Sequence, residues 1–276
     1  PQLEPLFVLL QSCGESCLDV LRGELRGLEV LYRGGEATQI KAAVGSLSAH
    51  TNHQIYAQVT AQLIKQAADA AASPLRVLEI GGGNGFLTRE ALPALNDTRI
   101  EYWFTDISAA FVDGARHWAE QHDYSCARFA VLDISEDPRQ QGFNETFDAI
   151  IGLDVVHATN DIGETLAHLH SMLAPGGTIH LIETSPSARW NTMVWGLAPH
   201  WWTYRDALRT TSPLLTSVQW IAALHGAGFD SAAAFAADDE AQCALVYAQR
   251  AAMSADDSDV MVLQADVTSA AQMSEA

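Results

Sequence analysis

The sequence predicts an α/β protein built on a doubly wound, mainly parallel β-sheet, with helices preceding the sheet. Apolar residues recur at helical spacing before residue 75, and from there short apolar runs alternate with helical segments. A glycine-rich turn directly follows the first of these runs. With 276 residues, 48% of them hydrophobic, the chain is long enough to bury the core of one such domain.

The elements follow in chain order. Segments 6–33 and 50–72 are predicted helices because large apolar residues recur every three or four positions; these are Leu18, Leu21, Leu25, Leu28, Ile55, Val59, Leu63 and Ile64. Short apolar runs predict strands at 75–80, 100–105, 127–132, 146–152, 177–183, 229–236 and 242–249. Helices are predicted at 86–95, 108–122 and 161–173. Ser108 and Asp161 are expected to cap the last two, and the run from Pro175 to Gly177 is expected to end the last one.

Three parts are expected: an N-terminal helical lid at 1–74, the α/β core at 75–250, and a C-terminal segment at 251–276. That segment is polar and then ends in VMVLQADVTSAAQ, which predicts a linker or the start of a following domain. Because the chain opens at Pro1 without a signal-peptide pattern, we expect a piece of a longer polypeptide. No apolar run approaches the roughly 20 residues that span a bilayer, so a soluble, cytoplasmic protein without a membrane partner is expected.

Charge and cysteine content narrow the function further. A net charge of -19, with only 15 Lys and Arg along the chain, argues against nucleic acid as a partner, because binding to phosphates needs clustered cations. The four cysteines are scattered, and neither they nor the histidines show metal-ligand spacing. We therefore expect reduced thiols and no metal site.

Polar residues gather at the predicted strand ends. In an open parallel sheet, ligands bind at the carboxyl ends of the strands, where the chain order reverses. The segments from Glu79 to Gly85 and from Asp154 to His157 lie there, as do Asp106, Asp133 and Glu183. The sequence therefore predicts one binding site along this edge.

The glycine-rich segment reads E-x-G-x-G-x-G. Gly81, Gly83 and Gly85 allow a tight turn and a close approach of the backbone to a ligand at the start of the next helix. The dinucleotide fingerprint G-x-G-x-x-G needs glycine where Phe86 stands, which argues against a pyrophosphate cofactor. A carboxylate at Glu79 favours a cationic ligand such as a sulfonium or an ammonium. The alternative is a glycine turn that binds nothing.

Acids at the next strand ends indicate a nucleoside. Asp106, followed by Ile107, stands where an acid hydrogen-bonds ribose hydroxyls. Asp133 and Ile134 are placed to meet the amino group and the ring face of adenine, although either Asp could instead cap the following helix. A cationic nucleoside points to S-adenosylmethionine, with S-adenosylhomocysteine as the product, and Asp154 is expected to complete the cofactor site.

His157 and Glu183 are the candidate catalytic pair. Both lie at ends of neighbouring predicted strands, so their side chains are expected near the transferred group. An imidazole accepts a proton near neutral pH, and a carboxylate behind it fixes the tautomer and stabilises the imidazolium. The alternative is that His157 only caps the next helix. Asp154 is a weaker candidate base and is expected mainly to shape the pocket.

An aromatic segment follows the fifth predicted strand. We expect its large side chains to line a channel for an elongated, largely apolar acyl substrate; these are Trp190, Trp195, Trp201, Trp202 and Tyr204. The alternative for any one of them is packing of a buried helix. Three arginines of the same segment, Arg189, Arg205 and Arg209, either meet a phosphate at the channel mouth or lie on solvated helix faces.

From about residue 75 to 250 the chain resembles the methyltransferase domains embedded in modular type I polyketide synthases. The resemblance rests on VLEIGGGNG, FTDIS, DVVHAT, ETLAHLHSMLAPGG, LIETSPSARW and WGLAPHWWTYRDALRTTSPLLTSVQWIAALHGAGF. It implies a class I Rossmann-like fold, S-adenosylmethionine as donor, and catalytic roles for His157 and Glu183. It further implies an acyl chain on the phosphopantetheine arm of an acyl carrier domain, and neighbouring synthase domains. VMVLQADVTSAAQ resembles part of a ketoreductase-type domain.

Two acceptors are compatible with a single base: the α-carbon of a β-ketoacyl thioester and a β-hydroxyl or enol oxygen. Oxygen is favoured, because only about 74 residues precede the first strand and the carbon-methylating members of this family usually carry a longer N-terminal lid. Two other classes compete. A nicotinamide-dependent oxidoreductase leaves the missing third glycine and the tryptophans unexplained, and an inactive structural domain leaves the intact His/Glu pair unexplained.

Overall fold

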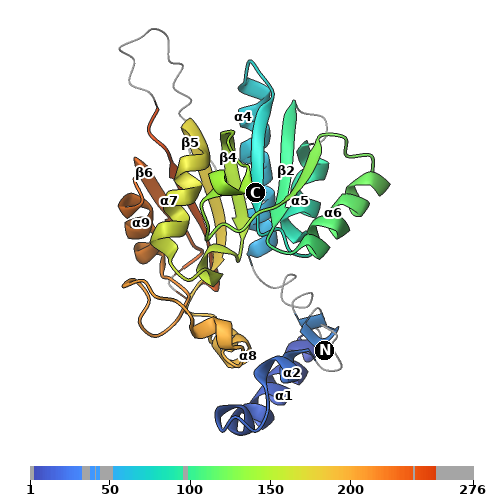
Figure 1. Ribbon diagram of the computed structural model, residues 1–276, viewed down its shortest axis with the longest axis vertical. Coiled ribbons are helices and arrows are strands. Elements are labelled where there is room, and N and C mark those ends of the chain that lie inside the picture. Colours follow the sequence, from blue (N-terminus) through green and yellow to red (C-terminus); the bar gives the residue numbers. More distant parts are fainter. Residues whose placement is uncertain are drawn as a thin grey trace.

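In the computed structural model, residues 3–32, 38–40, 42–43, 52–95, 99–238 and 240–252 are described, and Figure 1 shows their arrangement. Seven strands form one sheet in the order β3-β2-β1-β4-β5-β7-β6. Their bounds are β1 Leu75–Ile80, β2 Ile100–Asp106, β3 Ala127–Val131, β4 Phe147–Leu153, β5 Leu173–Thr184, β6 Ser231–Phe235 and β7 Cys243–Gln249. The pairs among β1 to β5 are parallel, and β7 runs antiparallel to both β5 and β6. The predicted mainly parallel, seven-stranded sheet is confirmed.

Helices cover both faces of this sheet (Figure 1). One face carries α4 (His53–Ala70), α5 (Phe86–Leu95) and α6 (Ala109–Gln121), and the other carries α7 (Ile162–Met172) and α9 (Ser217–Gly226). Short 3-10 turns η2 (Pro138–Gln141), η3 (Val156–Ala158) and η4 (Pro199–Trp202) complete the connections. The sheet is therefore buried on both sides, as its parallel strands require.

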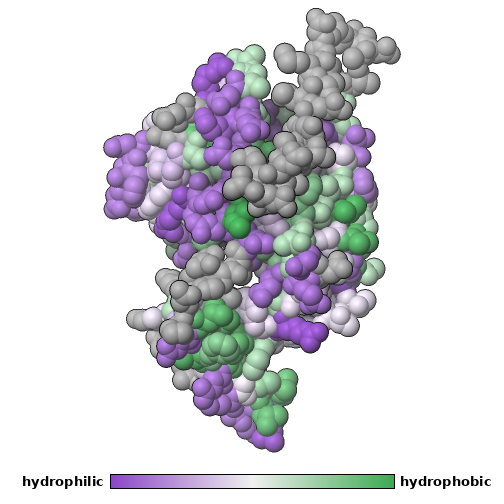
Figure 2. Space-filling view, turned by 180° about the vertical axis from the view of Figure 1, so that it is seen from behind, coloured by the Kyte–Doolittle hydropathy of each residue, from purple (hydrophilic) through white to green (hydrophobic). Residues whose placement is uncertain are grey.

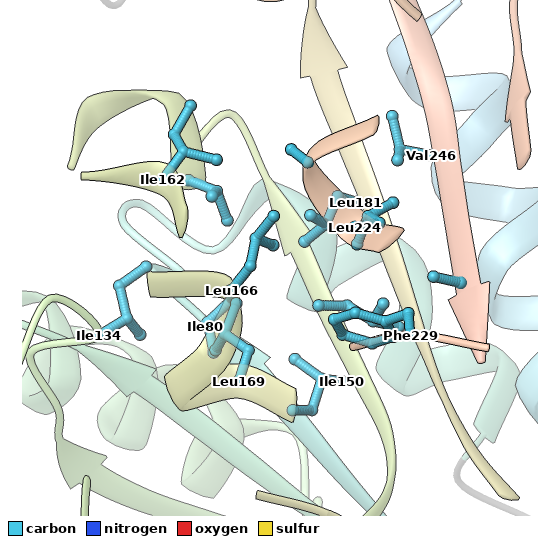
Figure 3. Packing of buried hydrophobic residues seen from close by; sticks show 14 of the residues in the cluster. Ile80, Ile134, Ile150, Ile162, Leu166, Leu169, Leu181, Leu224, Phe229 and Val246 are labelled. Atoms are coloured by element: carbon cyan, nitrogen blue, oxygen red, sulfur yellow. The ribbon is translucent and has the colours of Figure 1, made fainter. Parts of the chain in front are cut away.

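The two cores follow from the alternation of side chains along each strand. Val77 of β1 packs with the α4/α5 side, whereas its neighbour Leu78 packs with the α7/α9 side. Figure 3 shows the second core, where Leu166 of α7, Leu181 of β5 and Leu224 of α9 lie together. All three are fully buried.

The N-terminal helices differ from the prediction. The segment 6–33 is not one helix but α1 (Glu4–Leu21) and α2 (Gly27–Leu31), because Gly23 adopts a φ of +75° and ends the first helix. The leucines at helical spacing do not form its buried face: Leu18 and Leu21 are 63% and 76% exposed, while Leu6, Leu9 and Cys13 pack inward. In Figure 2 green hydrophobic surface is visible near this lower end of the molecule.

The lid packs on a segment far away in the sequence. Residues of α1 and α2 form a third core with the end of α8 (Arg189–Trp195) and the turn after it, through Val194, Leu197 and Ala198. At Gly27 an added Cβ would lie 1.7 Å from the carbonyl oxygen of Leu197, which shows how closely the two backbones approach. The first part of the predicted lid, α1 and α2, is thus tied to the aromatic segment, whereas its last helix, α4, packs on the sheet.

Two boundary predictions need correction, and part of the chain lies outside the described residues. Helix α7 ends at Met172, and the run from Pro175 to Gly177 lies inside the irregular start of β5 rather than ending the helix. Ser108 is at the N-cap position of α6 but makes no capping hydrogen bond, whereas Asp161 caps α7 through the amide of Glu164. The strand-like VMVLQADVTSAAQ and most of 33–51 fall outside the described residues. Among the helices that the structure describes, none has the length and apolarity to cross a membrane.

Candidate active site

The glycine loop follows β1 at the point where the sheet changes direction, between β1 and β4. Gly81, Gly83 and Gly85 all have positive φ, as the alternating glycines predicted. A Cβ at Gly83 would meet only the carbonyl oxygen of Gly81, at 3.9 Å, so the backbone there borders open space. Gly82, which the sequence analysis passed over, has no such freedom: its Cβ would fall 2.1 Å from Cε2 of Phe104.

Glu79 is turned away from this open space. Its Oε2 accepts hydrogen bonds from the hydroxyls of Thr88 and Tyr102, both at 2.7 Å, and the side chain is buried. Burial raises the pKa of Glu79 to about 7, against the opposing effect of the two hydroxyls. The carboxylate therefore joins β1 to α5 and β2, and it lines neither the large cavity at His157 nor the smaller one at Gly83.

Asp106 supports the loop from the side. Its Oδ2 accepts the backbone N–H of Gly83 at 2.9 Å, and Oδ1 accepts that of Ser108 at 2.8 Å. This carboxylate links the end of β2 to the glycine turn. The neighbouring side chain of Ile107 is 65% exposed.

Asp133 and Ile134 are placed differently from each other. Asp133 uses Oδ1 to accept both the backbone N–H and the hydroxyl of Ser135. This is a turn contact and not a helix cap, because the following 3-10 turn η2 is capped by Asp137. Ile134 is 7% exposed and packs in the α7/α9 core, as Figure 3 shows. The side chain of Ile134 is thus largely buried in the protein interior.

His157 and Glu183 lie together, as predicted. His157 Nδ1 is 2.6 Å from Glu183 Oε2, and Glu183 Oε1 accepts the backbone N–H of Val156 at 2.9 Å. Burial lowers the pKa of His157, but the charge and hydrogen bond of Glu183 outweigh it and hold that pKa above 6.5. Because Nδ1 is engaged, Nε2 is the ring nitrogen left to take a proton, and it has no protein partner among the described residues.

A cavity of about 400 Å³ lies in front of this pair. Its walls come from the glycine-loop end of α5, the loops after β4 and β5, and the aromatic segment; they include Phe86, Asp154, His157, Trp190, Trp195, Trp201 and Tyr204. The ring of Trp201 packs edge-to-face against His157, with centroids 6.1 Å apart. Trp202 does not line this cavity: it is 47% exposed and donates its Nε1–H to the carbonyl of Gly196. A smaller cavity of about 240 Å³ lies between the glycine loop and α6.

Comparison with known proteins identifies the family. A family model described as "Methyltransferase domain" matches residues 78–179. Highly reducing polyketide synthase pspA of Penicillium soppii is 34% identical over 221 residues, which is 78% of this chain and 8% of that protein. The solved CurJ carbon methyltransferase is 31% identical, with a TM-score of 0.77 over 91% of this chain and 68% of that one. The chain belongs to the methyltransferase domains of polyketide synthases.

Two further solved structures agree with this assignment. The DszA carbon methyltransferase is 29% identical, with a TM-score of 0.79 over 92% of this chain and 68% of that one. The trans-methyltransferase CalH, solved in complex with SAH, is 26% identical, with a TM-score of 0.72 over 91% of this chain and 69% of that one. The methyltransferase domain described here depends on S-adenosylmethionine. It spans less than a tenth of the length of the curated relatives it matches.

The site fits this cofactor. The open face of Gly83 is a cradle that any side chain would fill, and Asp106 holds it in place. Gly83 borders the smaller cavity, whereas Phe86, at the start of α5, and His157 line the larger one. Within the described residues, one group of donor atoms lies within 4.8 Å of one another, those of Asp154, His157 and Glu183. Two members of this group, His157 and Glu183, are hydrogen-bonded to each other.

Nothing in the sequence indicated His53 at this site, or the position that Arg209 takes there. His53, the first residue of α4, lines the large cavity, and its Nε2 is 3.3 Å from Asp154 Oδ2. Arg209, expected either at the channel mouth or on a solvated face, is 4% exposed and donates to the carbonyl oxygens of His157, Thr159 and Asn160. No local spacing signals these contacts, because the partners are about 50 to 100 residues apart in the chain.

Proposed function

We propose that this domain methylates the α-carbon of a β-ketoacyl thioester carried on a phosphopantetheine arm, with His157 as the base and Glu183 as its orienting partner. The single observation that carries the proposal is the His157–Glu183 hydrogen bond at the wall of an apolar cavity. Two solved neighbours, 31% and 29% identical, are carbon methyltransferases by name, which supports carbon as the acceptor atom.

This proposal replaces the sequence-based preference for oxygen. That preference rested on the length of chain before the first strand, compared with the longer lids of carbon-methylating members. The chain aligns over 91% of its own length with one carbon methyltransferase and over 92% with another, and it spans 68% of each of them. Lid length in a chain that covers only part of its relatives therefore does not discriminate between the two acceptors.

The proposed chemistry needs one proton acceptor. An α-proton between two carbonyls is acidic enough for an imidazole to remove, so the α-C–H bond breaks and the proton goes to Nε2 of His157. The electron pair left on the α-carbon forms the new carbon–carbon bond. S-adenosylmethionine, when bound, supplies an electrophilic methyl group and accepts the electrons of the broken S–C bond. Glu183 stabilises the imidazolium that results, consistent with the raised pKa of His157.

Roles for the other predicted residues follow from their positions. Asp106 and Ile107 at the end of β2 are proposed to meet the ribose and the adenine, and Asp133 contributes its free oxygen to the adenine side. The acyl chain is proposed to lie against Trp190, Trp195, Trp201 and Tyr204. An acyl carrier domain and neighbouring synthase domains are the proposed partners, and tethering raises the effective concentration of substrate despite the acidic surface.

The test is incubation with S-adenosylmethionine and either β-ketoacyl or β-hydroxyacyl pantetheine thioesters, followed by mass spectrometry to locate the methyl group. We expect methyl on the α-carbon of the β-ketoacyl substrate only. Methyl on oxygen would restore the alternative acceptor, and a chain that binds the cofactor without any transfer would indicate an inactive domain.

The His157→Ala variant tests the assigned base. We expect it to lose transfer, and also deuterium exchange at the α-carbon, while binding the cofactor as tightly as the unaltered chain. His117→Ala, on the exposed face of α6, is the matched control and should retain both activities. Unchanged turnover of His157→Ala would remove this residue from the mechanism.

A further inference from the structure

A second imidazole–carboxylate pair lies beside the first. His53 Nε2 is 3.3 Å from Asp154 Oδ2 and 3.4 Å from the hydroxyl of Thr184. The other carboxylate oxygen, Asp154 Oδ1, accepts the backbone N–H of Thr184 at 2.7 Å, and the backbone N–H of Asp154 donates to the carbonyl of Ile182. Asp154 is held between α4 and the end of β5, next to Glu183.

The backbone at Asp154 supports a functional reason for this arrangement. It has a φ of +52°, a conformation that costs free energy for a residue with a side chain. The contacts to Thr184 and Ile182 hold it there, and the strained turn places its carboxylate in the same cavity as His157. Two carboxylates, those of Asp154 and Glu183, therefore flank one catalytic imidazole.

We propose that His53 is a positioning residue that pairs with Asp154 and thereby sets the basicity of His157. The proposal rests on the base role of His157 proposed above. While His53 carries a proton, the negative charge of Asp154 is largely neutralised, and the proton affinity of His157 is governed mainly by Glu183. Without His53, the carboxylate of Asp154 is expected to attract the proton on His157 as well, so the base would be occupied at higher pH.

The other charged groups near His157 do not replace this pair. Arg209, from the segment before α9, donates to the backbone carbonyl of His157 and lowers the pKa of its ring. His200 lines the same cavity from η4. On the far side of His53, the thiol of Cys243 in β7 faces the ring. Burial lowers the pKa of His53, but the hydrogen bonds and charges of Asp154 and Cys243 outweigh it and raise that pKa. Burial raises the pKa of Asp154, but His53, with smaller contributions from His157 and Thr184, outweighs it and lowers that pKa.

The test compares His53→Gln, Asp154→Asn and the double variant, each measured in two ways. The first is the pH at which kcat, falling as the solution is made more acidic, reaches half of its plateau value. The second is the titration of His157 followed by NMR with S-adenosylhomocysteine bound. We expect His53→Gln to move both midpoints up by about one pH unit and Asp154→Asn to move them down. The double variant should lie within about 0.3 unit of Asp154→Asn, because His53 acts only through Asp154.

His117→Gln, on the exposed face of α6, is the control and should leave both midpoints in place. A His53→Gln midpoint that does not move in the NMR titration would overturn the proposal, as would shifts of the same sign in the two single variants. If the NMR midpoint moves and the kcat limb does not, the pair sets the pKa of His157 as proposed, but His157 is not the base. That result separates failure of the proposed function from failure of this inference.

Discussion

His180 offers a direct test of how burial acts on a titrating group in this domain. It lies in the centre of β5, 4% exposed, with Nε2 3.0 Å from the hydroxyl of Thr178 and its ring edge-on to Tyr247 at 5.2 Å. Its Nδ1 is buried without a hydrogen-bond partner among the described residues. Burial lowers the pKa of His180 to about 4, and no carboxylate offsets it.

The sign and the size of the effect follow from linkage. An unfolded chain binds the proton at the usual pKa of 6.5, whereas the folded chain resists it until about 4, so stability falls as the pH falls through this window. Taking one pKa unit as about 1.36 kcal/mol, this single group removes about 2 kcal/mol between about pH 8 and about pH 5. The full loss, below about pH 4, is about 3 kcal/mol.

The perturbation is His180→Phe, which fills a similar space and does not titrate, with His180→Gln as a second variant. Free energies of unfolding are measured by urea denaturation at about pH 8 and about pH 5, in dilute protein because the isoelectric point is about 4.7. Other groups titrate in the same range, Glu79 among them, so the decisive quantity is the difference in pH dependence between variant and unaltered chain. Between about pH 8 and about pH 5, we expect the free energy of unfolding of each variant to fall by about 2 kcal/mol less than that of the unaltered chain.

The control for this experiment is His117→Gln, because His117 lies on the exposed face of α6, far from β5 in the sequence. Equal pH dependence of the His180 variants and the unaltered chain would refute the reasoning. It would mean that His180 is protonated in the folded domain, or that the sheet opens to water at β5 before the domain unfolds.

Three further predictions concern the site. Gly82→Ala should lower the free energy of unfolding, measured by urea denaturation, by about 1–3 kcal/mol, because the new Cβ would lie 2.1 Å from the Phe104 ring. Gly114→Ala in α6 is the control: the position has open space around it, so the free energy of unfolding should rise by about 0.5–1 kcal/mol. Arg209→Gln breaks a buried ion pair with Asp206 at 2.6 Å and should lower the free energy of unfolding, measured by thermal unfolding, by about 3–5 kcal/mol. The exposed Arg116→Gln should lower it by less than about 1 kcal/mol, and equal decreases in the two variants would contradict the role of burial. Asp106→Asn should weaken binding of S-adenosylhomocysteine in calorimetry by about tenfold or more, and unchanged affinity would remove this carboxylate from the cofactor site.

The sequence by itself determined the sheet and the edge where the site lies. Alternation of apolar runs with helical segments specifies a parallel sheet, and parallel strands bring their carboxyl ends together whatever the details of packing. The alternating glycines Gly81, Gly83 and Gly85 predict the turn, because a positive φ is a local property of the backbone that glycine adopts readily. The pairing of His157 with Glu183 followed from the same geometry, because β4 and β5 are neighbours in the sheet.

Tertiary structure alone decided which way side chains turn and what meets them from distant parts of the chain. Glu79 had the residue type for a cationic ligand, yet two buried hydroxyls hold it inside the fold. Leu18 and Leu21, which stand at helical spacing in α1, proved to be exposed. The contacts of His53 with Asp154 and of Arg209 with His157 join segments about 50 to 100 residues apart. Such contacts depend on how helices and loops pack on the sheet, and the periodicity of apolar residues along the chain does not predict that packing.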